Sequence, residues 1–158
     1  MKFAKIMLYL FLISVFGFLC YFLLIFFELT WVYNMVIPLT GTIEKWLPGF
    51  QEFATYGIIV AWISALLWYV LAQWVFKVNK FSEAGKRLVW GLFTLLALLP
   101  TVVFSIIQSI ESPLQEGFVI PPLIYLLNFI IAFYVPTLLF SPSSFKYAPI
   151  PAKLVRRW

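Results

Sequence analysis

Apolar residues fill four long stretches of the chain that contain no charged side chain, residues 6–27, 53–76, 88–110 and 117–140. Each stretch is 22 to 24 residues long. An α-helix of that length reaches roughly 33 to 36 Å, enough to cross a hydrocarbon core of about 30 Å. Lipid accepts such segments when their backbone groups bond within the segment, which favours helices. The pattern predicts an all-α integral membrane protein whose four transmembrane helices form one domain over residues 1–140.

Composition agrees with a membrane location. Hydrophobic residues make up 64% of the 158 positions, which is more apolar surface than a soluble domain of this length could hide. The apolar run over residues 6–27 is also longer than the core of a signal peptide, which is about 7 to 15 residues. We therefore expect an uncleaved first helix and a lipid bilayer around the protein.

Charge is distributed unevenly between the predicted helix ends. The chain has 11 basic and 6 acidic residues, a net charge of +5. Every basic residue except Lys45 lies before the first span, between the second and third, or after the fourth. Basic residues near helix ends stay on the cytoplasmic side during insertion, so we expect both termini in the cytoplasm and a bacterial inner membrane as the location. Because topology accounts for the positive charge, no direct contact with nucleic acid is predicted.

Small and polar residues recur at helical spacing in the later spans. Gly57, Ala61 and Ala65 place a small side chain every fourth residue, a pattern that lets two helix backbones approach closely. Polar side chains fall on one face of the span 88–110, and an amide inside the span 117–140 needs a partner because an unpaired one is costly in lipid. The predicted helix-interface residues are Gly57, Ala61, Ser64, Ala65, Thr94, Thr101, Ser105, Gln108 and Asn128.

These residues admit more than one interpretation. They pack the four helices of one chain together, or they also join copies of the chain through the small face of the second helix, and we expect a homo-oligomer. Another interpretation is a polar path through several protomers. The four predicted spans hold no Asp, Glu, Lys, Arg or His, the residues that mark proton relays and many ion paths, so a pump or proton-coupled carrier is disfavoured.

The first external loop and two prolines carry further signals. Ile43 and Phe50 belong to a set of apolar positions at helical spacing, which predicts a short interfacial helix in that loop, interrupted by Pro48. Pro100 and Pro136 lie inside the third and fourth spans. Each removes a backbone donor, so kinks are expected there.

The end of the chain differs from the rest. Residues 141–158 have three prolines, four basic residues and no acidic residue, so we expect a cytoplasmic tail that does not fold alone. Such a tail binds anionic lipid or, through charge together with side chains such as Phe145, a cytosolic protein. The predicted docking residues for a partner or for lipid are Lys77, Lys80, Lys86, Arg87, Lys146, Lys153, Arg156, Arg157 and Trp158.

No pattern of side chains points to catalysis. The chain has no histidine, one cysteine (Cys20, inside the first span) and six carboxylates that all fall outside the predicted spans. Nothing in this inventory forms a nucleophile and base pair or a cluster of metal ligands. We therefore expect no enzymatic activity, no cofactor and no bound metal.

The remaining interpretation is a non-catalytic membrane subunit, a sensor or scaffold that self-associates and couples a membrane event to a cytosolic partner. In layout the chain resembles the small four-span immunity proteins that protect bacteria from pore-forming bacteriocins. It also resembles the small multi-span membrane components of two-gene bacterial antiphage systems. These resemblances imply an immunity protein in the first case and antiviral defence beside a cytosolic effector in the second. A passive channel or transporter subunit is the third alternative.

Overall fold

In a computed structural model, the chain forms an all-helical bundle with no strand among the residues that the structure describes. The described residues are 2–32, 34, 43–74, 81–111, 120–142, 145 and 148–149. The helical elements, in chain order, are α1 (Lys2–Leu23), the π-helical turn η1 (Leu24–Glu28), α3 (Ile43–Trp74), α4 (Glu83–Glu111), α5 (Ile120–Phe129), the π-helical turn η3 (Ile130–Tyr134) and α6 (Val135–Phe140).

In the part of the chain that the structure describes, four helices are long and apolar enough to cross a membrane, which confirms the four predicted spans. They cover Phe3–Val32, Leu47–Trp74, Glu83–Gln108 and Pro121–Phe140. The first span extends beyond its predicted end at residue 27, because the chain stays helical through η1 to Val32. The fourth span consists of α5, η3 and α6 in one continuous run.

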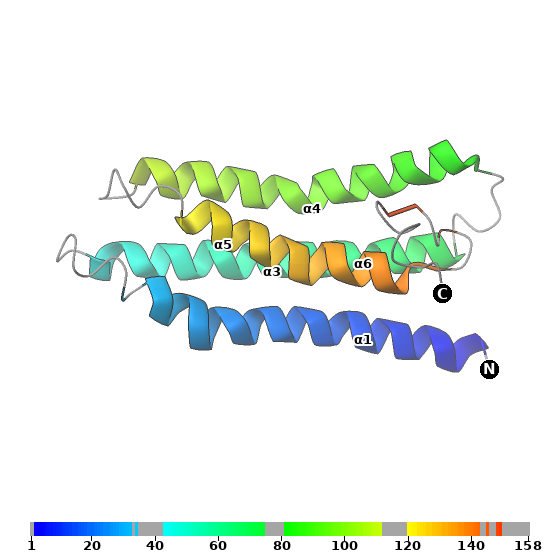
Figure 1. The fold of residues 1–158 in the computed structure, drawn as a ribbon, viewed down its shortest axis with the longest axis horizontal. Helices are drawn as coiled ribbons and strands as arrows, with labels where there is room; N and C mark the ends of the chain where they lie inside the picture. Colours follow the sequence, from blue (N-terminus) through cyan, green and yellow to red (C-terminus); the bar gives the residue numbers. More distant parts are fainter. Residues whose placement is uncertain are drawn as a thin grey trace.

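The spans run up and down in an antiparallel bundle (Figure 1). Helix α3 and the α5–η3–α6 run lie in the middle, with α1 and α4 on the two flanks. The start of α1, the end of α3, the start of α4 and the end of α6 meet at one end of the bundle, which we call the tail end. The opposite end, where α5 begins, is called the far end. The side of the membrane that each end faces stays a prediction.

Close helix packing in the middle of the bundle depends on small residues. Ala61 and Ala65 of α3 are completely buried within the chain's own bundle. On α1, a Cβ added to Gly17 would lie 2.7 Å from Cγ of Trp62, which is closer than real carbon atoms approach. The absence of a side chain at Gly17 therefore lets the indole of Trp62 on α3 lie against the backbone of α1.

The predicted interfacial helix in the first external loop is wrong as a separate element. Residues 43–50 are the first two turns of α3, which continues through Pro48 without a break. Phe50 is fully buried and its ring stacks on Tyr125 of α5, with ring centroids 5.4 Å apart. Burial of this side chain offsets the hydrogen bond that Pro48 removes, so the segment packs on the bundle instead of lying on the membrane surface.

Local sequence signals explain where α4 begins and how the fourth span bends. Ser82 caps α4, since its Oγ accepts a hydrogen bond from the backbone N–H of Gly85 at 3.1 Å. Pro100 lies inside α4, which stays one helix over its whole length. Pro136 is the second residue after η3 and would crowd the carbonyl of Ala132, four residues earlier; that carbonyl lies in the wider π-helical turn.

Candidate functional site

Glu28 lies inside the bundle, which corrects the prediction that all carboxylates fall outside the spans. Its side chain is 7% exposed and lies within the first membrane span. Cys20, Leu24 and Val32 are completely buried on the same face of this helix at spacings of four residues. The prediction ended the span at the first charged residue, whereas the buried stripe continues past Glu28 to Val32.

Asn128 of α5 joins Glu28 to Cys20. Its Nδ2 donates a hydrogen bond to Oε2 of Glu28 at 3.1 Å, and its Oδ1 accepts one from the thiol of Cys20 at 3.1 Å. The side chain of Asn128 is 2% exposed. The N–H of the amide meets the carboxyl oxygen of Glu28, which accepts, and the oxygen of the amide meets the thiol of Cys20, which donates. We call Glu28, Asn128 and Cys20 the polar cluster.

Several buried oxygen atoms at the far end have no hydrogen-bond partner among the described residues. They are Oε1 of Glu28 on η1, the hydroxyl of Tyr125 on α5 and Oε1 of Gln108 on α4. Tyr125 lies one helical turn before Asn128. The side chain of Gln108 reaches the backbone of Gly49 on α3, since a Cβ added to Gly49 would lie 3.4 Å from Nε2 of Gln108. Buried polar atoms are nearly always paired, so unpaired ones call for water or a ligand.

The polar cluster also lies next to both of the π-helical turns found among the described residues. Glu28 is the last residue of η1, and Asn128 lies two residues before η3. π-helical turns are rare and occur frequently at functional sites. Two such turns, bridged by one side-chain hydrogen bond, mark the polar cluster as the candidate functional site.

The tail end of the bundle is held by a different set of hydrogen bonds. Nε1 of Trp68 on α3 donates to Oγ of Ser141 at 3.0 Å, and Nε1 of Trp90 on α4 donates to Oγ1 of Thr137 at 3.3 Å. Ser141 in turn donates to the backbone carbonyl of Thr137. These contacts fix the end of the fourth span to α3 and α4.

Phe145 follows this anchor and is buried, so its predicted availability to a cytosolic protein is wrong. The side chain is 1% exposed and meets the ring of Trp68 edge-on, with centroids 5.4 Å apart. Its backbone N–H donates to the carbonyl of Pro142 at 2.8 Å, which folds the chain back toward the bundle. Nζ of Lys86 lies 5.6 Å from the centre of the Phe145 ring. Contact with the indole of Trp68 removes the apolar ring of Phe145 from water, which stabilises the buried position.

The other predicted helix-interface residues have varied surroundings. Thr101 and Gln108 are buried, whereas Gly57, Ser64, Thr94 and Ser105 are half-buried. The hydroxyls of Thr94 and Ser105 donate to the carbonyls of Trp90 and Thr101 in their own helix. The polar face of α4 is thus partly satisfied by its own backbone. A Cβ added to Gly57 would find nothing within 4 Å.

Two of the predicted docking residues lie in the described part of the chain. Lys86 is half-buried over Phe145, and Arg87 is exposed beside it. The others fall outside the described residues, and they are Lys77, Lys80, Lys146, Lys153, Arg156, Arg157 and Trp158.

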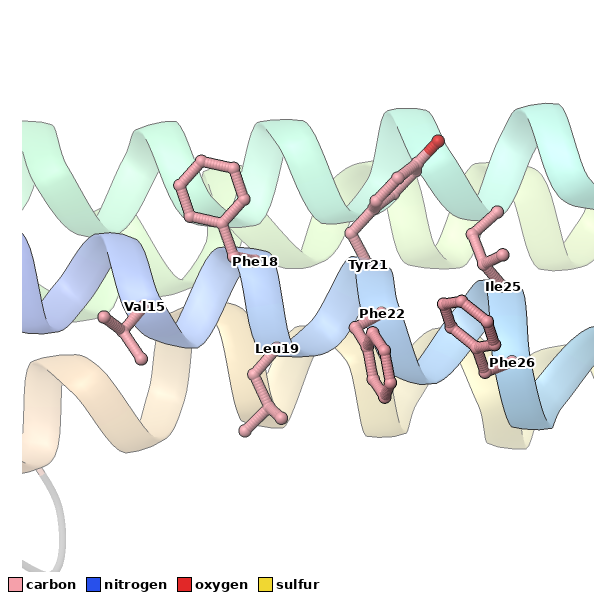
Figure 2. Close-up of a pocket in the computed structure, with 7 residues that line it drawn as sticks. All are labelled: Val15, Phe18, Leu19, Tyr21, Phe22, Ile25 and Phe26. Atoms are coloured by element: carbon pink, nitrogen blue, oxygen red, sulfur yellow. The ribbon is translucent and has the colours of Figure 1, made fainter.

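The outer face of α1 carries a shallow apolar groove of about 660 Å³ (Figure 2). All of its lining residues come from α1 and the η1 turn that continues it, and the ring centroids of Phe22 and Phe26 lie 4.4 Å apart. The lining residues are Val15, Phe18, Leu19, Tyr21, Phe22, Ile25 and Phe26. Such a surface suits the acyl chains of the surrounding lipid.

Comparisons of the chain with protein-family models, with curated proteins and with solved structures find no match. The function is therefore argued from the chemistry of the two ends of the bundle.

Proposed function

We propose that the chain is a non-catalytic membrane sensor subunit that couples an event at the far end of its bundle to a cytosolic partner at the tail end. The observation that carries this proposal is the continuity of α5, η3 and α6. This single helical run contributes Asn128 to the polar cluster, and it also contributes Thr137 to the anchor at the tail end.

The π-helical turn between these two points provides a physical means of coupling. A π-helical turn holds one more residue than an α-helical turn. Its conversion to α-helix would rotate every following residue by about 100° and shift it by about 1.5 Å along the axis. A rotation of that size breaks the hydrogen bond between Trp90 and Thr137. In this proposal, loss of the contact between Asn128 and Glu28 allows η3 to convert to α-helix. The conversion then breaks the hydrogen bond that anchors the tail.

The partner at the tail end is expected to be acidic. Lys5, Lys86 and Arg87 lie at this end, and four more basic residues follow in the chain after α6. The positive-inside rule supports a cytoplasmic position for this end. The setting that we propose is a bacterial inner membrane, in defence against phage beside a cytosolic effector; its support is the four-span layout with a basic tail.

Hydrogen exchange tests the coupling directly. We expect Asn128→Leu to accelerate amide exchange over residues 135–145, because the released helix end opens more often. Glu52→Gln is the matched control, since it alters an exposed carboxylate of α3 at the same end of the bundle. Unchanged exchange at the tail end in Asn128→Leu would reject the sensor.

A truncation tests the role of the tail. Removal of residues 150–158 keeps the buried Phe145 and takes away the last three basic residues. We expect the shortened protein to insert and fold normally but to lose co-purification with its cytosolic partner. If the shortened protein retains biological activity, the cytosolic partner does not need the tail, and the loop between α3 and α4 becomes the proposed contact.

Self-association through α3 is part of this proposal. Gly57 is half-buried with open space around it, so it offers a second helix a place of close approach. Native mass spectrometry in mild detergent is expected to show oligomers for the parent and fewer for Gly57→Leu. A parent protein that is only monomeric rejects this part of the proposal.

A transporter or channel subunit is the second candidate, and Glu28 is the observation that favours it. An ionisable side chain inside a span is typical of proton and ion paths. Flux of protons or of monovalent cations into vesicles that contain the purified protein, abolished by Glu28→Gln, would favour this candidate over the sensor.

A further inference from the structure

Glu28 is the only acidic or basic residue that is buried among the side chains that the structure describes. One of its carboxyl oxygens accepts a hydrogen bond from Asn128, and the other has no partner among the described residues. An ionised carboxylate in such surroundings requires a neighbouring cation, and without one it takes up a proton instead.

No described side chain supplies that cation. The η1 turn that carries Glu28 contacts α1 and α3, Asn128 brings α5 to it, and η3 continues α5. Their titratable groups include Cys20, which shares Asn128 with Glu28, and the buried hydroxyl of Tyr125. None of the remaining titratable groups of these elements carries a positive charge. They are Tyr9, Tyr21, Tyr56, Tyr69, Tyr134 and Glu52, together with Glu44, whose side chain lies outside the described residues.

The basic residues of these elements do not fill the gap. Lys2 and Lys5 belong to the first turn of α1, at the tail end, more than twenty residues from Glu28. Lys45 is the one basic residue of α3, and its side chain lies outside the described residues. α5, η3 and α6 have no basic residue in their sequence.

We infer that the carboxyl group of Glu28 is an exchangeable proton site within the membrane and that a proton is the ligand of the sensor. This inference rests on the proposed function, whose site it shares. In the protonated state the proton resides on Oε1, which has no partner among the described residues, while Oε2 accepts from Asn128. Release of the proton leaves a buried negative charge, which draws in water or displaces η1 from Asn128.

The geometry favours a proton over a metal cation. Hard cations such as Ca²⁺ are bound by six or more oxygen atoms. Among the described residues, no three side chains of Asp, Glu, His or Cys come together as a metal site. The amide N–H of Asn128 donates to the carboxyl group of Glu28, and its partial positive charge would repel a bound cation. The unpaired hydroxyl of Tyr125, one turn from Asn128, offers water a second contact on the way to Glu28.

Infrared difference spectroscopy tests the site in protein reconstituted into vesicles of zwitterionic phospholipid. A protonated carboxyl group gives a C=O stretching band that an ionised carboxylate lacks. We expect this band in the parent at acidic and neutral pH, its replacement by carboxylate bands at alkaline pH, and its loss in Glu28→Gln. Asn128→Leu should shift the band to higher frequency, because it removes the hydrogen bond to Oε2. Glu52→Gln is the matched control and should leave the band unchanged.

The outcomes separate the possibilities. Carboxylate bands alone over the whole pH range would mean that Glu28 is permanently ionised and paired, for example with Lys45, and would overturn the inference. A carboxylic acid band that persists at alkaline pH would also overturn it, since the proton would not exchange. Labelling with a hydrophobic carbodiimide, which attacks protonated carboxyl groups in apolar surroundings, gives an independent measurement. Peptide mass spectrometry is expected to locate the adduct on Glu28, with labelling that declines as pH rises.

The inference and the proposed function can fail separately. If the carboxyl proton of Glu28 titrates but Glu28→Gln leaves amide hydrogen exchange at the tail end unchanged, the proton site stands and the sensor function is rejected. An effect at the tail end without proton exchange would keep the coupling and require a different trigger.

Discussion

The two ends of the bundle use buried polar side chains in opposite ways. At the tail end, Trp68, Trp90, Thr137 and Ser141 satisfy one another in a connected set of hydrogen bonds. At the far end, the polar cluster leaves one oxygen of Glu28 without a hydrogen-bond partner among the described residues. Complete sets of buried hydrogen bonds make a structure rigid, whereas incomplete ones are costly to keep. The contrast shows a tail end that holds the chain in place, and it supports our proposal that the far end responds to a ligand.

The orientation of the two ends is the sharpest test of this contrast, because its result is all or none. Single cysteines replace Ala84, exposed near the start of α4, and Glu52, exposed at the far end of α3, in a Cys20→Ser background. We expect an impermeant thiol reagent to label the cysteine at position 52 in intact cells and the one at position 84 only after lysis. The reverse pattern would place the sensor end in the cytoplasm and contradict the proposed direction of coupling.

The next effect should come from the tail end. Trp68→Ala removes a completely buried indole, its hydrogen bond to Ser141 and its contact with Phe145. We expect a loss of about 3 to 5 kcal/mol of folding free energy, as is typical of large truncations in a packed interior. Denaturant unfolding in mixed micelles measures it. Trp74→Ala, an exposed tryptophan in the last turn of α3, is the control and should cost far less.

A smaller effect is expected where α1 packs on α3 between the two ends. Gly17→Ala places a methyl group 2.7 Å from Trp62, and overpacking of this kind costs about 1 to 3 kcal/mol. Gly57→Ala is the matched control, because its added methyl group meets nothing within 4 Å. Equal stability of the two variants would show that α1 moves freely against α3. The packing of α1 on α3 would then not connect the two ends of the bundle rigidly.

The smallest net effect is expected within the polar cluster. Asn128→Leu or Glu28→Leu alone leaves a buried group without a partner and should cost about 1 to 3 kcal/mol. The double variant removes both groups and should recover most of that loss, since replacing both partners by apolar side chains is often nearly neutral. Additive losses in the double-mutant cycle would mean that the cluster serves stability, as the tail end does.

The sequence was sufficient to predict the four spans, because long uncharged runs have one physical explanation in a bilayer. It was less informative about where helices end. Glu28 was taken as the limit of the first span, yet the buried positions Leu24 and Val32 lie four residues to either side of it. A test for continued periodicity, instead of for the first charge, would have found the buried carboxylate.

Other features had no usable signal in the sequence. The π-helical turns η1 and η3 consist of ordinary apolar residues, apart from the final Glu28, and depend on tertiary packing. Phe145 resembled an exposed tail residue because its neighbours are polar, and only its distance to Trp68 reveals its burial. Asn128 was recognised as a residue that needs a partner, but an amide does not indicate which partner it has.

Hydroxyl groups that bond to their own helix have an electrical consequence for the whole bundle. Within the described part of the chain, the hydroxyls of Ser14, Thr30, Thr55, Thr94, Ser105 and Ser141 each donate to the backbone carbonyl four residues earlier. A hydroxyl engaged in this way is less able to replace the hydration shell of an ion. A single protomer should therefore conduct ions poorly, and a planar bilayer that contains it should keep a high electrical resistance.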